Sequence, residues 1–333
     1  MEKRQLGSAG PWISAIGIGA LSFSDFYGPS DTEISHAVLT TALNLGIDHL
    51  DTSNVYGSGI SEERIGLFLA KQGAGRNDLF KIATKASIRR AEDGSNVFDN
   101  SPAHLTQELD KSLKRLGVDV IDLYYMHRRD PKYQIEDVVE TLVGFVKAGK
   151  IKQFGFSEIA PTSLARAAAV HPVGAVQSEY SLSTRSPELG LVQKTAEVGA
   201  ALVAFCPVGR SLLTDTPHDR KKAETMPFLN NNPRFMEPNL SLNIAATNPF
   251  RSLASDMGVA TASLAVAWLL HHGSHIIPIP GTRSTEHLKE LAKGVDLKLR
   301  TSDLTAINKI LPLGWAHGDR YSVSQWNGPE RFC

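Results

Sequence analysis

Cysteine is scarce in this chain, and neither sign of charge is in excess. Only Cys206 and Cys333 occur among 333 residues, which is too few for a disulfide framework and is typical of a reducing compartment. Lys and Arg number 35, as do Asp and Glu, so the balance gives no electrostatic basis for binding nucleic acid or an anionic membrane. We therefore expect a cytoplasmic protein with neither of these partners.

Long apolar runs are missing as well. No stretch reaches about 18 uninterrupted apolar residues, and the first residues lack the apolar run of a signal peptide. Hydrophobic residues nevertheless make up 42% of the chain and charged residues 21%, which predicts a globular protein with a substantial core.

Short β-like runs alternate with longer helix-like patterns along the chain. The strand candidates are residues 15–20, 46–51, 80–85, 120–127, 151–156, 174–178, 200–206 and 276–279. The helical patterns are residues 31–45, 61–70, 102–116, 135–147, 161–170, 187–197, 249–272 (broken near Gly258) and 284–293. Such alternation predicts a parallel sheet with helical crossovers, either a (β/α)8 barrel or an open doubly wound sheet. Eight strands favour the barrel, as one domain over residues 1–333.

Three segments stand outside the eight repeats. Residues 1–14 predict an N-terminal β-hairpin, and residues 301–311 predict an extra helix followed by a C-terminal tail. The segment 209–246, after the seventh strand, is expected to be one long loop. Loops of this length are usually functional lids or disordered.

Four polar residues lie at or just past the ends of strand candidates: Asp51, Tyr56, Lys85 and His127. Each alone has an ordinary explanation, such as a surface lysine or a capping aspartate. In a (β/α)8 barrel, however, the carboxyl-terminal ends of all strands open onto one face, where active sites are built. We therefore expect these four residues to meet.

Together the four residues suit proton transfer to a carbonyl oxygen. A phenol has a pKa near ~10, which a neighbouring ammonium lowers. Lys85 can supply that charge and Asp51 can hold Lys85; a drop of about 2–3 units corresponds to roughly 3–4 kcal/mol. His127 can orient the substrate oxygen or help move the proton. Since no residue is an obvious nucleophile, a bound cofactor would have to deliver hydride.

The motifs around these residues resemble those of the aldo-keto reductases, an NADPH-dependent (β/α)8 family whose catalytic tetrad is Asp, Tyr, Lys and His. They are Asp51-x4-Tyr56-Gly57, Thr84-Lys85 and Asp122-Leu123-Tyr124-Tyr125-Met126-His127, and the resemblance runs from about Leu6 to Tyr321. It is greatest to a microbial and plant branch of aryl-aldehyde and pyridoxal reductase type. Motifs of that branch are Phe26-Tyr27-Gly28-Pro29, His127-Arg128-x-Asp130-Pro131, Ser157-Glu158, Gln177-Ser178-Glu179-Tyr180-Ser181-Leu182 and Gly318-Asp319-Arg320-Tyr321. The resemblance implies reduction of small aldehydes or ketones to alcohols.

The resemblance also implies a cofactor site for the nicotinamide half. Ser157 and Gln177 would contact the carboxamide, Tyr180 would stack on the ring, and Glu158 is expected as a further cofactor contact. The pyrophosphate would lie under the segment that contains Pro207, Gly209, Ser211 and Leu212. This segment departs from the family pattern at Cys206, Val208 and Ser211, and we interpret Cys206 as an inert buried thiol.

The other half of the cofactor would lie after the eighth strand. The implied contacts are Ile279, Gly281, Thr282, Arg283, His287 and Glu290. Arg283 can fork onto a 2′-phosphate beside a helix N-terminus, which predicts NADP(H), with NADH as the weaker alternative. His287 stands where the family commonly has Arg, and Leu291 where it commonly has Asn.

The substrate pocket is expected from residues that follow the strands and from the tail: Phe23, Phe26, Tyr27, Ile88, Arg128 and Trp315. An alternative function is an NADPH-binding sensor or channel-associated subunit of the same fold, which would turn over slowly. A metal-dependent barrel hydrolase would need a His-x-His after strand one, and residues 18–24 contain no His. We therefore expect no metal, and the sequence predicts no particular oligomeric state.

Overall fold

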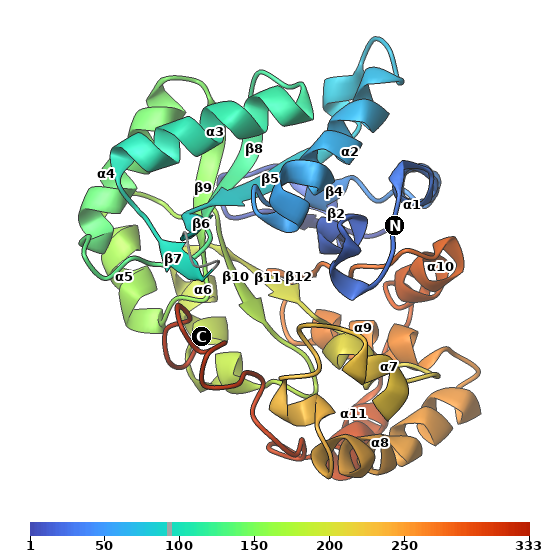
Figure 1. Ribbon diagram of the computed structural model, residues 1–333. Helices are drawn as coiled ribbons and strands as arrows, with labels where there is room; N and C mark the ends of the chain where they lie inside the picture. Colours follow the sequence, from blue (N-terminus) through green and yellow to red (C-terminus); the bar gives the residue numbers. More distant parts are fainter. Residues whose placement is uncertain (92–94) are drawn as a thin grey trace.

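Eight parallel strands form the centre of the molecule (Figure 1). The computed structural model describes residues 1–91 and 95–333. The strands are β3 (Ile18–Gly19), β4 (His49–Asp51), β5 (Lys81–Ala86), β8 (Ile121–Met126), β9 (Ile151–Ser157), β10 (Ala175–Glu179), β11 (Ala201–Phe205) and β12 (Ile276–Pro278). They pair in chain order from β3 to β12, which confirms all eight expected strands.

The first and last strands close the sheet into a barrel. The Gly17 amide donates to the Pro278 carbonyl at 2.9 Å, and the Gly19 amide donates to the Pro280 carbonyl at 3.0 Å. A Cβ atom on Gly19 would lie 2.7 Å from the Ile279 carbonyl oxygen, so only glycine permits this approach. The fold is therefore a (β/α)8 barrel and not an open sheet.

Helices surround the barrel (Figure 1). They are α1 (Thr32–Asn44), α2 (Ile60–Ala70), α3 (Pro102–Leu116), α4 (Ile135–Lys147), α5 (Pro161–Val170), α6 (Leu191–Val198), α9 (Thr261–His271) and α10 (Thr285–Lys293). Local sequence sets the ends of α3, for example. Ser101 accepts a capping hydrogen bond from the His104 amide at 3.2 Å, Pro102 occupies the first position, and Gly117 ends the helix at φ 66°.

Strand alternation separates two apolar layers. Side chains that point outward pack against the helices in the main core, while a smaller cluster fills the barrel. The inner cluster includes Ala83, Leu123, Tyr125, Ala175 and Val203, with Phe205 at its edge. Polar inward positions at the carboxyl-terminal end of this cluster form the site described below.

The N-terminal hairpin and the extra C-terminal helix are present as expected. The hairpin pairs β1 (Lys3–Gln5) with β2 (Trp12–Ser14), and the helix is α11 (Thr301–Ile310). A second hairpin, β6 (Ile88–Arg90) with β7 (Asn96–Phe98), was not expected from the sequence.

Three segment predictions were wrong. The expected loop contains α7 (Arg220–Glu224), and α8 (Asn239–Asp256) begins well before Pro249, which lies inside it. Apolar side chains of this segment form their own buried cluster, which stabilises it: Leu212, Ala223, Met226, Leu229, Phe235 and Leu240. The helix expected at 187–197 is interrupted at Gly190, where φ is 154°, and only α6 is α-helical.

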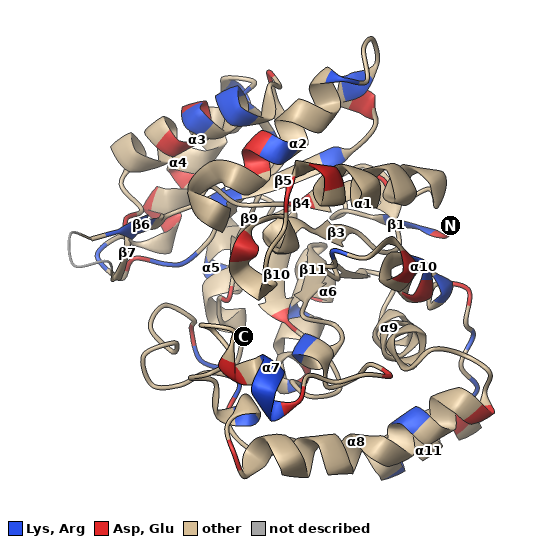
Figure 2. Ribbon diagram, turned by 45° about the vertical axis from the view of Figure 1, so that its right-hand side comes forward, with Lys and Arg blue, Asp and Glu red and all other residues tan. Residues whose placement is uncertain are grey.

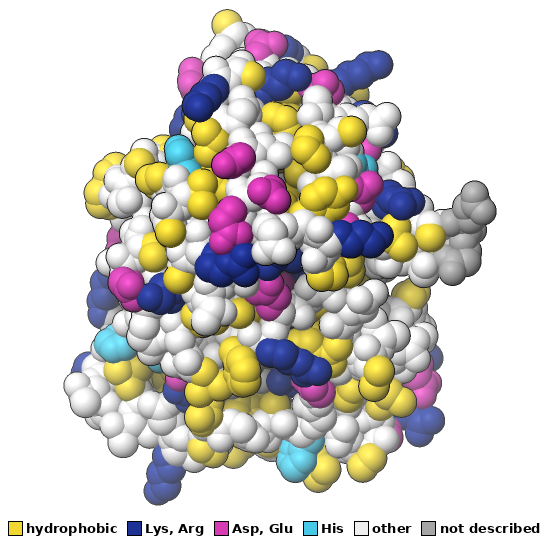
Figure 3. Space-filling view, turned by 90° about the vertical axis from the view of Figure 1, so that its left-hand side faces the viewer, with side chains coloured by type: hydrophobic (Ala, Val, Ile, Leu, Met, Phe, Trp, Pro, Cys, Tyr) yellow, Lys and Arg dark blue, Asp and Glu magenta, His cyan; other side chains and the backbone are white. Residues whose placement is uncertain are grey.

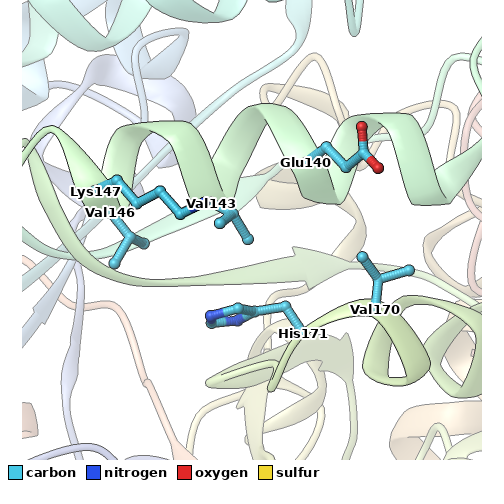
Figure 4. A pocket seen from close by; sticks show the side chains of 6 residues that line it. All are labelled: Glu140, Val143, Val146, Lys147, Val170 and His171. Carbon is cyan, nitrogen blue, oxygen red and sulfur yellow. The ribbon is translucent and has the colours of Figure 1, made fainter.

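Basic and acidic side chains alternate over the surface. Figure 2 shows both signs on α2, α3 and α10, and the face in Figure 3 mixes them with apolar side chains. Of the two cavities described, one of about 540 Å³ lies between α4 and α5, lined by side chains such as Val143, Val146 and His171 (Figure 4). The other lies at the N-terminal hairpin. Neither cavity contains a residue of the candidate site.

Within the described ranges, no helix alone is long and apolar enough to cross a membrane. The pair α8 and α9 passes on length and composition, but with a bend of 91° between its members.

Candidate active site

The four residues singled out in the sequence meet at the carboxyl-terminal face of the barrel. The Lys85 ammonium donates hydrogen bonds to Asp51 Oδ1, to the Thr52 carbonyl at 2.8 Å and to the Tyr56 hydroxyl at 3.4 Å. It also lies 5.0 Å from the centre of the Tyr56 ring. The expected juxtaposition is therefore present, with Lys85 in the middle.

The Lys85–Asp51 pair is enclosed by protein. The Lys85 side chain is 0% exposed and that of Asp51 is 2% exposed. The second oxygen of Asp51 accepts a hydrogen bond from Gln177 Nε2 at 2.7 Å. Because both carboxylate oxygens have donors, Asp51 can remain charged in the interior and hold Lys85 in place.

The local backbone explains how Tyr56 reaches Lys85. Gly57 has φ 61°, and a Cβ atom there would lie 2.8 Å from Ser24 Cβ. Glycine after Tyr56 is therefore required both by the left-handed conformation and by the contact with the segment after β3. This tight turn places the half-buried Tyr56 phenol over the end of β5.

The expected lowering of the Tyr56 pKa was wrong. Burial raises the pKa of this phenol, the Asp51 charge raises it further, and Arg128 lowers it by a smaller amount. The ammonium of Lys85 is compensated by Asp51, so it cannot offset burial as an isolated charge would. Tyr56 is therefore a protonated phenol, and as an acid it is weaker than a phenol in water.

His127 is held as a neutral imidazole. Burial, and then the charges of Arg128 and Lys85, lower the pKa of His127 well below its ordinary value. Ser53 Oγ lies 3.1 Å from His127 Nδ1. A neutral imidazole has one donor and one acceptor nitrogen, and the tautomer with its proton on Nε2 would donate that proton to a substrate oxygen. Ser53 was missed in the sequence; its place two residues after Asp51 was the available signal.

The two residues expected at the carboxamide lie beside the tetrad. Gln177 donates a hydrogen bond to Asp51 of the tetrad, and Ser157 Oγ accepts a hydrogen bond from Arg128 Nη1 at 3.1 Å. Glu158 differs. Its carboxylate, 0% exposed, pairs with Arg320 at 2.8 Å and accepts a hydrogen bond from the Glu179 amide at 3.0 Å.

The expected role of Glu158 as a cofactor contact is therefore corrected. Its side chain fastens the tail to the barrel through Arg320, whose Nη2 also contacts Cys333 Sγ at 3.1 Å. Beside it, Arg210 pairs with the buried Glu179 at 2.6 Å. Burial is the largest cause that raises the pKa of the Cys206 thiol, to about 12. That thiol is therefore protonated and unreactive as a nucleophile.

The expected stacking role of Tyr180 was also wrong. Its ring is 0% exposed and packs at 5.7 Å from the Trp268 ring, and its hydroxyl donates to Glu188 at 3.0 Å. Tyr180 points outward because it is one residue past Glu179, and successive residues of a strand face opposite sides. The aromatic ring at the top of the barrel is Phe205, which the alternation Ala201, Val203, Phe205 would have identified.

The segment after β11 turns sharply. Gly209 has φ 56°, and a Cβ atom there would lie 2.7 Å from Ser183 Oγ. Pro207 is buried, and Ser211 Oγ accepts a hydrogen bond from the His218 amide at 2.9 Å. The Leu212 side chain is buried in the separate apolar cluster of this segment, so a cofactor contact through that side chain is excluded.

The segment after β12 carries the expected phosphate-binding residues to the start of α10. Thr282 is buried and Arg283 half-buried, with Arg283 Nη1 donating to the Pro29 carbonyl at 2.6 Å. His218 is close enough for Arg283 and Lys222 to depress its pKa, after the larger effect of burial. His218 and Lys222 had no recognisable signal in the sequence, because they lie in the expected loop.

The other residues expected at this end are split between core and surface. Ile279 belongs to the cluster inside the barrel, and Gly281 approaches the Gly19 carbonyl so closely that a Cβ atom would lie 2.7 Å from it. His287 is exposed on the first turn of α10, and Glu290 is half-buried.

Some of the residues expected at the substrate pocket are partly exposed and others are buried in the core. Phe26 and Tyr27 are half-buried, with ring centres 4.9 Å apart, and Ile88 lies half-buried in the β6–β7 hairpin. Phe23 is 0% exposed within the main core, so it cannot line the mouth, which corrects that prediction. Trp315 donates to the Leu182 carbonyl at 2.7 Å and packs against the main core.

Residues 1–91 and 95–333 contain no group of three or more His, Cys, Asp or Glu side chains arranged to hold a metal ion.

The barrel and its polar face define the class of protein. The chain belongs to the aldo/keto reductase family, whose sequence profile matches residues 15–312. It is 36% identical over 316 residues to the aldo-keto reductase yakc of Schizosaccharomyces pombe, with 93% of this chain and 92% of that protein covered. It is 33% identical over 332 residues to probable aldo-keto reductase 1 of Glycine max, with 98% and 93% covered.

Solved structures agree with this assignment. A glycerol dehydrogenase from Gluconobacter oxydans matches with a TM-score of 0.81 at 25% identity, with 93% of this chain and 94% of that chain covered. The holo form of an aldo-keto reductase from Bacillus halodurans matches in fold with a TM-score of 0.78 at 24% identity, with 98% and 99% covered.

Proposed function

We propose that this protein reduces an aldehyde or ketone to an alcohol with NADPH as the hydride donor and Tyr56 as the proton donor. The observation that carries the proposal is the Tyr56 hydroxyl at 3.4 Å from the buried Lys85 ammonium. Membership of the aldo/keto reductase family supports it, as does the yeast relative's name, which includes NADP(+).

The residues present fit such a cofactor. The side chains of Ser157 and Gln177 lie beside the tetrad, where they could bind the carboxamide of the cofactor. The ring of Phe205 points into the barrel and could stack on the nicotinamide. Arg283 and the first turn of α10 would hold a 2′-phosphate. NADPH bound there would supply a hydride to the carbonyl carbon.

The tetrad would then stabilise the negative charge that develops on the carbonyl oxygen of the substrate. Tyr56 is kept protonated and donates its proton to that oxygen, while the Lys85 ammonium stabilises the resulting phenolate. Asp51 fixes Lys85, and neutral His127 would donate from Nε2 to the substrate oxygen. Because Lys85 and Asp51 are enclosed, their charges act with little screening by water.

The reaction is tested by following NADPH absorbance with a panel of aldehydes and ketones, and with NADH in parallel. Oxidation with at least one carbonyl compound is the expected result. Tight NADPH binding with negligible oxidation across the panel would contradict the proposal and favour the sensor or channel-subunit alternative.

Arg283→Ala is expected to raise the dissociation constant for NADPH by about tenfold to a hundredfold, because a charge-assisted bond to the 2′-phosphate is worth about 1.5–3 kcal/mol. The dissociation constant for NADH, which lacks that phosphate, should change little. Fluorescence titration of both cofactors measures the difference. Equal losses for the two cofactors would rule out the 2′-phosphate role.

A further inference from the structure

Arg128 follows His127 directly, and within the described residues it has no carboxylate at salt-bridge distance. Neighbouring arginines differ in this respect: Arg129 pairs with Glu330 at 3.1 Å, Arg210 with Glu179 at 2.6 Å, and Arg320 with Glu158 at 2.8 Å. The charge of Lys85 is likewise compensated by Asp51. Among the described residues, Arg128 therefore has no ion-pair partner of its own beside the tetrad, and the Glu158 carboxylate that its charge also affects is paired with Arg320.

The position of the Arg128 side chain is fixed by the protein. Its Nη1 donates to the His127 carbonyl at 2.7 Å and to Ser157 Oγ at 3.1 Å. The tail packs against its stem, because a Cβ atom on Gly328 would lie 3.1 Å from Arg128 Cδ. The guanidinium is thus held between the histidine of the tetrad and the end of β9, with little side-chain entropy left to lose on binding.

The rest of the guanidinium is available to a ligand. A guanidinium has five N–H donors, and the three on Nε and Nη2 donate to no protein atom in the described chain. Neither nitrogen is among the enclosed, unpartnered polar atoms, and Arg128 as a whole is half-buried. Donors in this arrangement match the two oxygens of a carboxylate or a phosphate.

We propose that Arg128 binds an anionic group, a carboxylate or a phosphate, on the carbonyl substrate and so selects anionic aldehydes or ketones over neutral ones. This inference rests on the proposed function. It assigns Arg128 to the substrate, whereas the nicotinamide contacts fall to Ser157 and Gln177.

The test compares substrates of one scaffold that differ in charge. The anionic probes are 3-carboxybenzaldehyde, 4-carboxybenzaldehyde and 4-formylphenyl phosphate, and the neutral probe is methyl 4-formylbenzoate. For the wild-type protein we expect kcat/KM to be at least about tenfold higher for an anionic probe than for the ester. The better of the carboxylate and phosphate probes identifies the anion.

The variants isolate the guanidinium. Arg128→Met should lower the ratio of kcat/KM for the preferred anionic probe to kcat/KM for the ester by about tenfold to a hundredfold. Arg128→Lys keeps the positive charge but loses the bidentate geometry of the guanidinium. Its ratio of kcat/KM between anionic and ester probes should therefore lie between those of the wild type and Arg128→Met. Arg129→Met is the matched control, because it removes an adjacent arginine that is already paired, and it should leave the ratio between anionic and neutral probes unchanged.

Binding of 4-(hydroxymethyl)benzoate, measured by calorimetry on the protein with NADP+, gives a readout that does not depend on turnover. Loss of this binding in Arg128→Met with unchanged NADP+ affinity supports the proposal even if no aldehyde is reduced. Equal loss for anionic and neutral probes, or a raised NADP+ dissociation constant in Arg128→Met, overturns it. A ratio that falls equally in Arg129→Met also overturns it, because the effect would then come from net charge alone.

Discussion

Tyr56→Phe is expected to lower kcat by about 10²–10⁴-fold while the dissociation constant for NADPH stays nearly unchanged. The substitution removes a hydroxyl within hydrogen-bond reach of the buried Lys85 ammonium, at 3.4 Å, and with it the proton donor to the carbonyl oxygen. The ring itself remains to fill the turn before Gly57. Single-turnover oxidation of NADPH, with cofactor affinity measured separately, distinguishes lost chemistry from lost binding.

Tyr27→Phe is the matched control for this prediction. Tyr27 also carries a hydroxyl near the mouth, but it accepts from Arg210 at 3.2 Å and does not contact Lys85. We expect its removal to cost far less turnover. Near-wild-type turnover in Tyr56→Phe would show that the proton comes from another group.

Lys85→Met should both abolish most turnover and lower the free energy of unfolding by about 3–5 kcal/mol. It leaves the Asp51 carboxylate enclosed, with Gln177 as its remaining side-chain partner and no positive charge beside it. The double variant Asp51→Asn/Lys85→Met should recover most of the lost stability, since no unpaired charge remains, but none of the lost turnover. Urea unfolding and NADPH oxidation on the same preparations measure the two effects.

The double variant is the informative member of this cycle. If it were as unstable as Lys85→Met, the loss would come from packing around the Lys85 stem and not from an uncompensated Asp51. Recovery of turnover in the double variant would contradict the role of Lys85 in stabilising charge on Tyr56.

Much of this fold and the centre of its site could be predicted because both follow from periodicity. Asp51 ends β4, Lys85 lies one residue before the end of β5 and His127 directly follows β8, and parallel strands in a barrel bring such ends to one face. The same rule, applied fully, excludes Tyr180: Gln177 and Glu179 face inward, so their neighbour cannot. That error came from giving a motif position more weight than strand parity.

Other parts of the site depend on contacts that sequence order does not show. Glu158 is occupied by Arg320, which lies 162 positions away, and only the folded tail reveals that pairing. The pKa of Tyr56 is set first by burial of the phenol itself and then by the charge of Asp51, which no local pattern reports. Pro249 was read as a helix start because proline is common there, whereas the apolar cluster around Leu240 extends α8 past it towards the N-terminus.

The seam between β3 and β12 also bears on how the protein is made. The Ser22 hydroxyl binds the Thr282 carbonyl across 260 positions of sequence, so the ring of strands stays open until nearly the whole chain has left the ribosome. Until then β3 and the most recently synthesised strand present unpaired edges, which are sites for association with other chains. All four tetrad residues lie in the first half of the chain, yet the barrel that shields them from water closes only when β12 has been made. A chain that stops before β12 (Ile276–Pro278) would hold all four residues and lack a closed barrel around them.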